Sequence, residues 1–233
     1  MWGYDIEYNG KKTADYDMYV MQRPNIPSPE LKAQEIEVPG KGNVYIRDGT
    51  VSDIDIQVDI NFSVSPDIWF SKWREAKKWL LHFESVGKLK FTDDAAFFYR
   101  VKKVTIDTAE REAYKIGKFT VTFTCEGYMY LESGSKEYGI SSVLKNDYEE
   151  CHPTFILTGS SNTTITVNGK KFIVNVGQSC TIDTDRMLTY RQSGELMNTY
   201  VTGDYEDLYL KPGTNSISTS GASVKVIPNW RCL

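Results

Sequence analysis

Alternation of apolar and polar residues is the strongest pattern in the first half of the chain. Over residues 51–62, every second side chain is apolar and most of the intervening side chains are acidic or amide. Successive side chains of a strand point to opposite faces, so this pattern predicts a long strand with one buried and one acidic face. The same reasoning predicts further strands at residues 88–91, 97–106 and 118–125.

A helical pattern replaces this alternation over residues 66–83. Ser65 is a suitable N-cap, and Pro66 suits the first helical position. Tryptophans in a stripe can stack on sugars or bases. Because the spacing is that of a core-facing helix face, we predict instead a helix packed on a sheet. The stripe comprises Trp69, Trp73, Ala76, Leu80 and Phe83.

The sequence changes character between residues 131 and 150, where serine, glycine and acidic residues become frequent. Such stretches are typical of connections between domains. We therefore predict a mainly β chain with an N-terminal β-sandwich-like domain at residues 1–135, which contains the one predicted helix, and a C-terminal domain at residues 136–233.

Short strands and turns dominate the predicted C-terminal domain. Asn168-Gly169 predicts a two-residue hairpin turn, because a type I′ turn needs two residues with positive φ. Lys211-Pro212-Gly213 is typical of a turn with proline second and glycine third. We expect strands at residues 163–167, 170–176, 179–183 and 187–191, and a closing hairpin of residues 217–219 and 223–227 around Ser220-Gly221. This pattern favours a β-sandwich or a β-barrel.

Composition excludes several classes of protein. The 27 basic and 31 acidic side chains give a formal net charge of −4, which is not the basic footprint of a duplex-binding protein. No apolar run reaches the ~18 residues of a membrane helix, and residues 1–7 do not resemble a secretory signal. We therefore expect a protein that stays in, or assembles in, the cytoplasm. Aromatic residues make up 13% of the chain, which suits strands and protein interfaces.

Residues suited to catalysis or metal binding are few. The four cysteines, Cys125, Cys151, Cys180 and Cys232, are widely spaced, so we predict reduced thiols and no metal site. Adjacent Cys151 and His152 point to opposite sides of an extended chain, so a nucleophile–base pair is not expected there. His82 lies at the predicted helix end. The sequon Asn162-Thr163-Thr164 has no role in a chain that is not secreted.

Carboxylates are common but do not mark a site. Asp53, Asp55 and Asp59 lie on one predicted strand face and have three interpretations: acid/base groups, one edge of a calcium site, or a solvated or subunit-facing surface. We favour the last, because glycosidase carboxylates face each other across a cleft and calcium loops converge from a tight turn. Asp183 and Asp185 are interpreted in the same way. We therefore predict no catalytic, cofactor-binding or metal-binding residue, and no enzyme.

The order of these segments resembles the distal tail proteins of siphophages and their prophages. The N-terminal half carries the likeness through a strand pair within residues 2–20, the loop Val38-Pro39-Gly40-Lys41-Gly42-Asn43, the strand at residues 51–62, the tryptophan helix, and strands ending at residues 119–131. The C-terminal half resembles the family's galectin-like β-sandwich. Its matching pieces are residues 153–159, the Asn168-Gly169 hairpin, Ile182-Asp183, residues 211–215 and Trp230-Arg231.

The resemblance implies a structural virion protein at the tail tip. In that family the N-terminal domains form a six-membered ring between the tail tube and the baseplate or tip, and the genome passes through its lumen without specific binding. The second domain holds tail-associated or receptor-binding proteins. No long insertion follows Cys151, which favours a plain adaptor. The implied location is the phage tail tip, assembled in the host cytoplasm, with no cofactor and no membrane insertion.

An alternative function is saccharide binding by the C-terminal sandwich. Tyr190, Tyr200, Tyr205 and Tyr209 are the candidate stacking rings for this function. Near the N-terminus, Tyr4, Tyr8, Tyr16 and Tyr19 are instead candidates for contacts between subunits.

Overall fold

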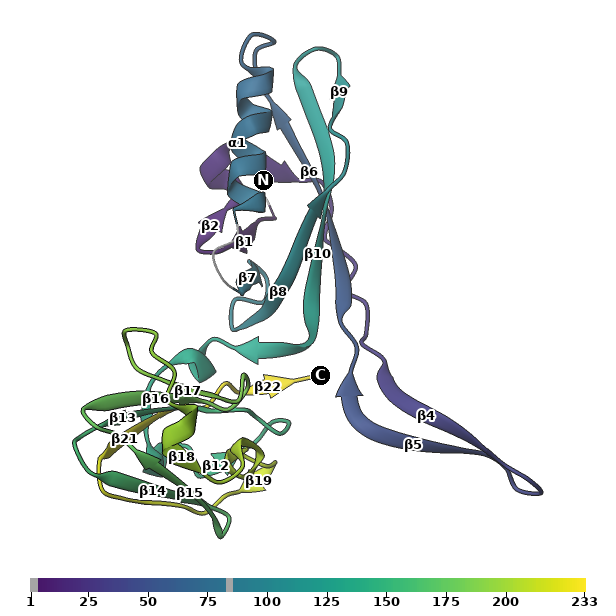
Figure 1. The fold of residues 1–233 in the computed structure, drawn as a ribbon. Coiled ribbons are helices and arrows are strands. Elements are labelled where there is room, and N and C mark those ends of the chain that lie inside the picture. Colours follow the sequence, from purple (N-terminus) through teal and green to yellow (C-terminus); the bar gives the residue numbers. More distant parts are fainter. Residues whose placement is uncertain (1–3, 83–85) are drawn as a thin grey trace. The chain divides into compact units, whose positions relative to one another are not determined.

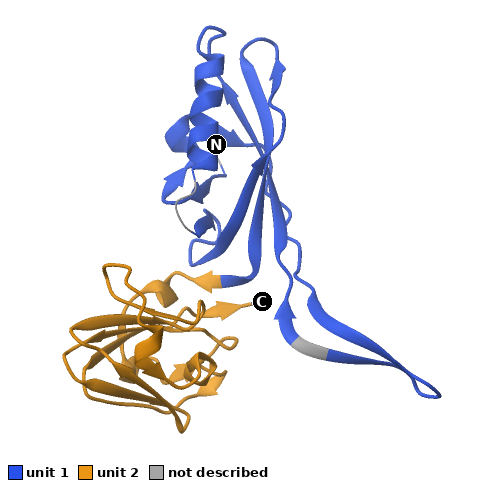
Figure 2. Ribbon diagram, viewed as in Figure 1, with its two compact units in different colours: residues 1–129, 233 blue, residues 130–232 orange. Residues whose placement is uncertain are grey.

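The computed structural model describes residues 4–82 and 86–233, with the side chains of Arg47 and Asp48 left out. The chain is mainly β, as predicted, and it divides into two compact units (Figure 2). Unit 1 comprises residues 1–129 and 233, and unit 2 comprises residues 130–232. The observed boundary, after residue 129, precedes the predicted one, after residue 135, by six residues. The predicted position is the end of a 3-10 turn, η2 (Ser133–Ser135).

Unit 1 is built on a curled sheet with the strand order β2-β1-β7-β8-β10-β6-β3 (Figure 1). The short β9 adds to β10. The strands are β1 (Ile6–Tyr8), β2 (Lys11–Lys12), β3 (Met18–Val20), β6 (Ile54–Ser63), β7 (Gly87–Phe91), β8 (Phe97–Ile106), β9 (Glu110–Glu112) and β10 (Ile116–Leu131).

The curl of this sheet brings distant strands together. The first and last strands of the order, β2 and β3, are joined by the short 3-10 turn η1 (Thr13–Tyr16). The ring of Tyr8 on β1 lies 5.3 Å from the ring of Phe123 on β10, although β7 and β8 separate these strands in the sheet. The concave face therefore encloses the core of unit 1.

Helix α1 (Trp69–Leu81) packs on this core, as the tryptophan stripe predicted. Ala76 and Leu80 are fully buried. The ring of Trp73 lies 5.0 Å from that of Phe119, and the ring of Trp69 lies 5.6 Å from that of Phe62. The stripe therefore belongs to the hydrophobic core.

The helix begins later than predicted. The Ile68 amide donates to the Ser65 carbonyl at 3.1 Å, so residues 66–68 form a turn and Pro66 precedes the helix. Ser65 does not cap the helix; the N-cap position is Ile68, with no side-chain cap. Arg111 donates to the Pro66 carbonyl at 3.3 Å, a tertiary contact that favours the turn. Phe83 lies outside the described residues.

The long strand predicted at residues 51–62 is two strands. β6 begins at Ile54, and Val51 ends the preceding strand, β5 (Gly42–Val51). The Ser52 amide donates to the Glu30 carbonyl at 2.9 Å, and the Glu30 amide donates to Ser52 Oγ at 2.8 Å. These two bonds interrupt the strand where a hairpin begins. Within β6 the predicted alternation is confirmed: its apolar side chains are buried and pair in register with β10.

The hairpin consists of β4 (Leu31–Val38) and β5, and these strands form a separate two-stranded sheet. Its strands pair with no other strand among the described residues, and Figure 1 shows it continuing away from the start of β6. The sequence predicted only a loop at residues 38–43 in this region. The observed turn there joins two strands of eight and ten residues.

Unit 2 is a sandwich of two sheets. One has the order β11-β21-β13-β16-β17 and the other β18-β15-β14-β20, while β12 pairs with β19, and β22 with the end of β10. The strands are β11 (Tyr138–Gly139), β12 (Lys145–Asn146), β13 (Thr154–Thr158), β14 (Asn162–Val167), β15 (Lys170–Asn175), β16 (Ser179–Asp183), β17 (Leu188–Tyr190), β18 (Val201–Thr202), β19 (Gly213–Thr214), β20 (Ile217–Ser220), β21 (Ser223–Ile227) and β22 (Arg231–Cys232); the 3-10 turns are η2, η3 (Ile140–Ser142), η4 (Asn198–Tyr200) and η5 (Tyr205–Leu208).

Both sheets contribute to one core in unit 2. Phe155 and Leu157 come from β13, and Ile165 and Phe172 come from β14 and β15; all four are fully buried. The predicted turn at Asn168-Gly169 is confirmed, because both residues have positive φ, 51° and 83°.

The predicted closing hairpin is wrong. β20 pairs with β14 in one sheet, whereas β21 pairs with β13 in the other. The turn at Gly221 therefore crosses between the sheets. Its φ is +110°, and a Cβ there would lie 2.5 Å from the Asn162 carbonyl oxygen. The Ala222 amide also donates to Thr163 Oγ1 at 2.8 Å, so contacts with β14 direct the crossing.

Candidate functional site

The β4–β5 hairpin has one apolar face and one polar face, and neither is buried in its own chain. Ile36 pairs with Val44 and Gln34 pairs with Ile46, so Ile36, Val44 and Ile46 share one face. All three side chains are exposed, Ile46 by 51%. An apolar strand face left in water indicates a surface that another molecule covers.

The opposite face of the hairpin is polar. Tyr45 Oη donates to Glu35 Oε1 at 3.3 Å, and Asn43 donates to the same oxygen. At the tip, the Lys41 amide donates to the Val38 carbonyl at 3.0 Å. Gly40 has φ +80° and Gly42 has φ +76°, values that favour glycine. The Pro-Gly-Lys-Gly turn beside Val44-Tyr45-Ile46 is the sequence feature that indicates this hairpin.

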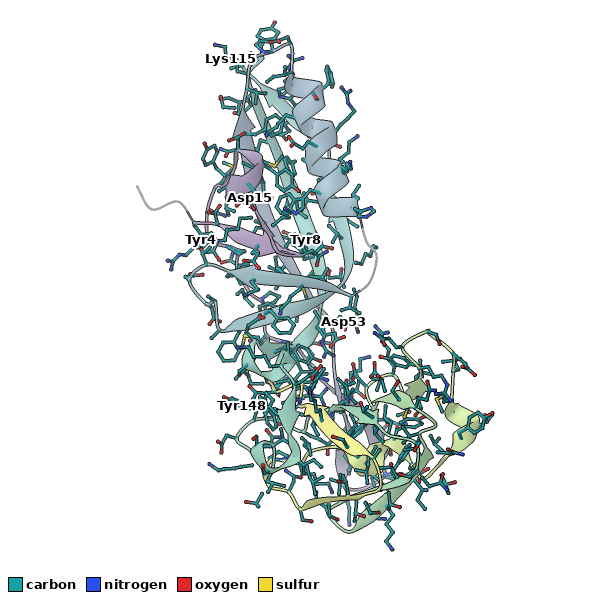
Figure 3. All side chains as sticks on the ribbon, turned by 90° about the vertical axis from the view of Figure 1, so that its left-hand side faces the viewer. Tyr4, Tyr8, Asp15, Asp53, Lys115 and Tyr148 are labelled. Atoms are coloured by element: carbon teal, nitrogen blue, oxygen red, sulfur yellow. The ribbon has the colours of Figure 1, made fainter. Side chains whose placement is uncertain are left out.

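The outer face of β6 carries the predicted acidic residues. Thr120 Oγ1 donates to Asp59 Oδ1 and Thr124 Oγ1 donates to Asp55 Oδ1, both at 2.6 Å. Lys102 is 2.7 Å from Asp53, which Figure 3 labels. These carboxylates therefore point to threonines and a lysine rather than toward one another, an arrangement unlike a glycosidase pair.

A groove of about 320 Å³ lies along this face, and we call it the acidic groove. Its floor is formed by side chains of β6, and its wall by the segment between β3 and β4. Its lining residues are Gln22, Pro24, Asn25, Ile26, Pro27, Asp55, Gln57 and Asp59.

A larger cavity of about 650 Å³ lies beside the end of α1. The rings of Tyr16 and Trp79 stack at its wall with centroids 4.7 Å apart, and Trp79 Nε1 donates to the Tyr8 carbonyl at 3.3 Å. His82 also lines the cavity, together with side chains of both charges. The lining includes no cysteine and one carboxylate, Glu75, which lies 3.0 Å from Lys72.

The four cysteines are free, and three of them are buried. Burial raises the pKa of Cys125 to about 12 and that of Cys151 to about 11. The Cys151 thiol donates to the Glu149 carbonyl at 3.0 Å. Because the thiolate is the nucleophile, these raised pKa values leave both thiols unreactive near neutral pH.

His152 belongs to a side-chain cluster that excludes Cys151. Its Nδ1 lies 2.8 Å from Asp185 Oδ1, and its Nε2 lies 3.0 Å from an Arg231 nitrogen. Arginine only donates, so Nε2 accepts and the proton is on Nδ1. The Tyr209 ring stacks on the imidazole at 4.0 Å. His152 therefore fixes local structure around the C-terminal strand.

Asp183 holds a turn. Its Oδ1 accepts the amides of Asp185 and Arg186, each at 3.1 Å. Among the residues that the structure describes, no group of three or more His, Cys, Asp or Glu side chains is placed to hold a metal ion. No helix in the described ranges is long and apolar enough to span a membrane.

The N-terminal tyrosines mostly serve their own chain. Tyr8 is fully buried, so its predicted role in a subunit contact is wrong. Tyr16 stacks on Trp79, and Tyr4, which Figure 3 labels, stacks on Phe91 with ring centroids 6.4 Å apart. Of the four, only Tyr19 is largely exposed, at 60%.

Two of the four tyrosines considered for saccharide binding contact other side chains of unit 2. Tyr205 packs 5.1 Å from the Phe172 ring, and its hydroxyl lies 2.9 Å from Thr189 Oγ1. Tyr209 is covered on one side by His152. Tyr200 is 55% exposed. The contacts of Tyr205 and Tyr209 therefore give no support to a stacking platform formed by these two rings.

Comparison with known proteins gives matches among solved structures only. No family model and no curated protein matches the chain. The Dit protein of phage SPP1, described as a paradigm of the hub adsorption apparatus of phages infecting Gram-positive bacteria, has a TM-score of 0.60 and 14% identity over 96% of this chain and 97% of that chain.

Two further matches are to chains of the phage P2 baseplate in its activated conformation. The structure with calcium has a TM-score of 0.58 and 12% identity, over 99% of this chain and 98% of that chain. The structure with strontium has a TM-score of 0.53 and 11% identity, over 96% and 97%. The chain therefore has the fold of phage hub and baseplate proteins, which confirms the fold expected from the resemblance.

Proposed function

We propose that the chain is a structural component of the tail tip of a siphophage or prophage. Copies of the chain form a ring, with six subunits, that connects the tail tube to the baseplate or tip. The full-length fold match to the SPP1 hub protein and to the P2 baseplate supports this role.

The exposed β4–β5 hairpin is the observation that carries this proposal. An isolated two-stranded hairpin is at best marginally stable in water. Here Ile36, Val44 and Ile46 form an apolar face that its own chain leaves uncovered. A second copy in a closed ring would cover that face in every subunit, and a ring leaves no end uncovered.

Other partners follow from the same role. Unit 2, a sandwich of its own, is the attachment point for tail-associated and receptor-binding proteins. The genome passes through the ring lumen without specific binding, which the net charge of −4 favours because DNA-backbone binding needs concentrated lysine and arginine. The protein is then located in the virion after assembly in the host cytoplasm.

The mass of the full chain in solution tests the proposal. We expect native mass spectrometry to find a hexamer and negative-stain images to show rings. A variant in which Asn-Gly replaces residues 32–50 would join Leu31 to Val51, which already pair. This variant should remain a folded monomer, because the hairpin supplies no core residue of unit 1. A wild-type chain that stays monomeric at high concentration contradicts the proposal, and a hairpin-free variant that still forms rings contradicts the role of the hairpin in the ring.

A further inference from the structure

Helix α1 exposes a basic face on an acidic protein. The helix carries four cations, Lys72, Arg74, Lys77 and Lys78, against one carboxylate, Glu75, while the whole chain has a net charge of −4. Arg74 and Lys78 are exposed on the side of the helix that faces away from the core that Ala76 and Leu80 fill, whereas Lys72 is largely covered. Charge on the helix is therefore opposite in sign to that of the chain.

Two of these cations have no ion-pair partner among the residues that the structure describes. Lys72 lies 3.4 Å from Asp17 and 3.0 Å from Glu75, and Lys77 lies over the Trp73 ring at 5.4 Å. Arg74 and Lys78 make no ion pair with any described residue, and both are exposed. They are one helical turn apart, so they share a face.

Exposed apolar side chains extend this surface. Phe70 precedes Arg74 by four residues and is 58% exposed, and Leu81 at the end of the helix is 49% exposed. We call Phe70, Arg74, Lys78 and Leu81 the helix face. Aromatic and arginine side chains together with apolar neighbours are typical of protein interfaces.

The acidic groove has the complementary composition. Asp55 and Asp59 each accept one threonine hydroxyl, which fixes the carboxylate, and neither has an ion pair within the described residues. Asp53, by contrast, is neutralised by Lys102. Pro24, Ile26 and Pro27 give the groove an apolar wall. The groove therefore offers two orientated, uncompensated carboxylates beside apolar contacts.

The helix face and the groove lie on opposite sides of the same sheet. Asp55 and Asp59 alternate along β6 with Ile56, Val58 and Ile60, which are fully buried in the core on which α1 packs. One copy cannot bring its own two surfaces together. Two copies can, and a contact between different surfaces of identical chains repeats around a closed ring.

We propose that the helix face of one copy docks into the acidic groove of the next, with Arg74 and Lys78 pairing with Asp55 and Asp59. This inference rests on the proposed ring and identifies residues of its subunit contact. Residues four apart are about 6 Å apart along a helix and about 13 Å apart along a strand. We therefore expect one close ion pair and one looser pair.

Charge reversal tests this contact in the full chain. The double variants Arg74→Glu/Lys78→Glu and Asp55→Lys/Asp59→Lys should each raise the protein concentration for half-assembly by about tenfold or more, since like charges then face each other. Combining all four substitutions should restore assembly to within about threefold of wild type. Four further variants each reverse one of Arg74 and Lys78 together with one of Asp55 and Asp59. The variant that restores assembly best identifies the closer ion pair.

Two controls separate charge from folding. Lys170→Glu/Lys171→Glu reverses two exposed lysines of β15 in unit 2 and should leave assembly unchanged. Asp55→Asn/Asp59→Asn keeps an acceptor for each threonine hydroxyl, so it should weaken assembly without changing thermal unfolding. Added salt should weaken the wild-type ring more than the Asn variant, because salt screens ion pairs.

The outcomes distinguish this inference from the proposed function. Rings that form normally in both reversal variants overturn the docking and leave the ring intact. Loss of assembly that no combination of reversals restores also overturns the docking. A wild-type chain that forms no ring overturns the proposed function itself.

Discussion

Two hairpins in this chain have similar local geometry and opposite burial. β14–β15 in unit 2 turns at Asn168-Gly169, and β4–β5 turns at Gly40 to Gly42; all four residues named here have positive φ. In the first hairpin Ile165, Phe172 and their neighbours on the same face are fully buried, whereas the second buries none of its described side chains.

This difference in burial shows which hairpin stabilises its own unit. The β14–β15 hairpin is half of a sandwich, so its apolar face stabilises its own unit. The β4–β5 hairpin has an apolar face of similar character but no sheet opposite it among the described strands. In the proposed ring a second copy covers this face, so substitutions in it should change assembly rather than folding.

The largest expected effect is on the buried hairpin. Phe172→Ala removes a fully buried ring that packs 5.1 Å from Tyr205. We expect the free energy of unfolding of unit 2 to fall by about 3–5 kcal/mol, the usual cost of such a cavity. Urea denaturation followed by circular dichroism measures it. The matched change Ile46→Ala should alter the unfolding free energy by less than about 0.5 kcal/mol. A similar loss at both positions would contradict the inference that only the β14–β15 hairpin stabilises its own unit.

The next effect should appear only in assembly. Ile36→Asp/Ile46→Asp places charge on the apolar face of the β4–β5 hairpin, and desolvating that charge in an interface is costly. We expect the concentration for half-assembly to rise by about tenfold or more, with unchanged urea denaturation. Glu37→Lys on the opposite face is the control. Normal rings from the double variant would show that this face stays in water.

A smaller change in unfolding free energy is expected from alanine substitutions in the turns of the two hairpins. Gly169 has φ +83° and Gly40 has φ +80°, and an added Cβ meets no atom within 4 Å at either position. Backbone strain alone should therefore reduce the unfolding free energy of Gly169→Ala by about 1–2 kcal/mol. Gly40→Ala should leave global unfolding unchanged, because the β4–β5 hairpin contributes no core. Equal losses of unfolding free energy in the two variants, measured in urea, would contradict this expectation and show that the β4–β5 hairpin contributes to global stability.

The smallest expected effect is a loss of unfolding free energy at alkaline pH. Burial raises the pKa of Cys151 from an ordinary value of 9.0 to about 11, so the neutral thiol is favoured in the folded unit. This stabilisation is complete below pH 9 and is lost as the pH rises toward 11. Between pH 8 and pH 10 we expect a loss of about 1 kcal/mol that Cys151→Ser reduces. An identical pH dependence in the variant would exclude the thiol as its source.

Much of the strand content could be predicted from local pattern. The alternation of β6 and β10, and the turn at Asn168-Gly169, depend on neighbours in sequence, so their sequence features were sufficient. The tryptophan stripe predicted the packing of α1 for the same reason. The helix start was missed because Arg111, more than forty residues away, contacts the carbonyl of Pro66.

The candidate site was less predictable. The β4–β5 hairpin has only a short apolar alternation, and its turn was interpreted as a loop. The tyrosines near the N-terminus were expected at an interface, yet Tyr8 lies in the core because the curled sheet brings β1 opposite β10. Burial of an amphipathic strand depends on what faces it, and that partner is distant in sequence.

The sequence by itself determined the strands β6 and β10, the presence of helix α1 and the sharp turn at Asn168-Gly169, because these depend on side-chain periodicity and local backbone preference. Only the tertiary structure decided which sheet each strand joins. β20 and β21 separate at Gly221 because β14 and β13 offer the available strand edges, and β4–β5 is left exposed because no other described strand of unit 1 pairs with it or covers its apolar face.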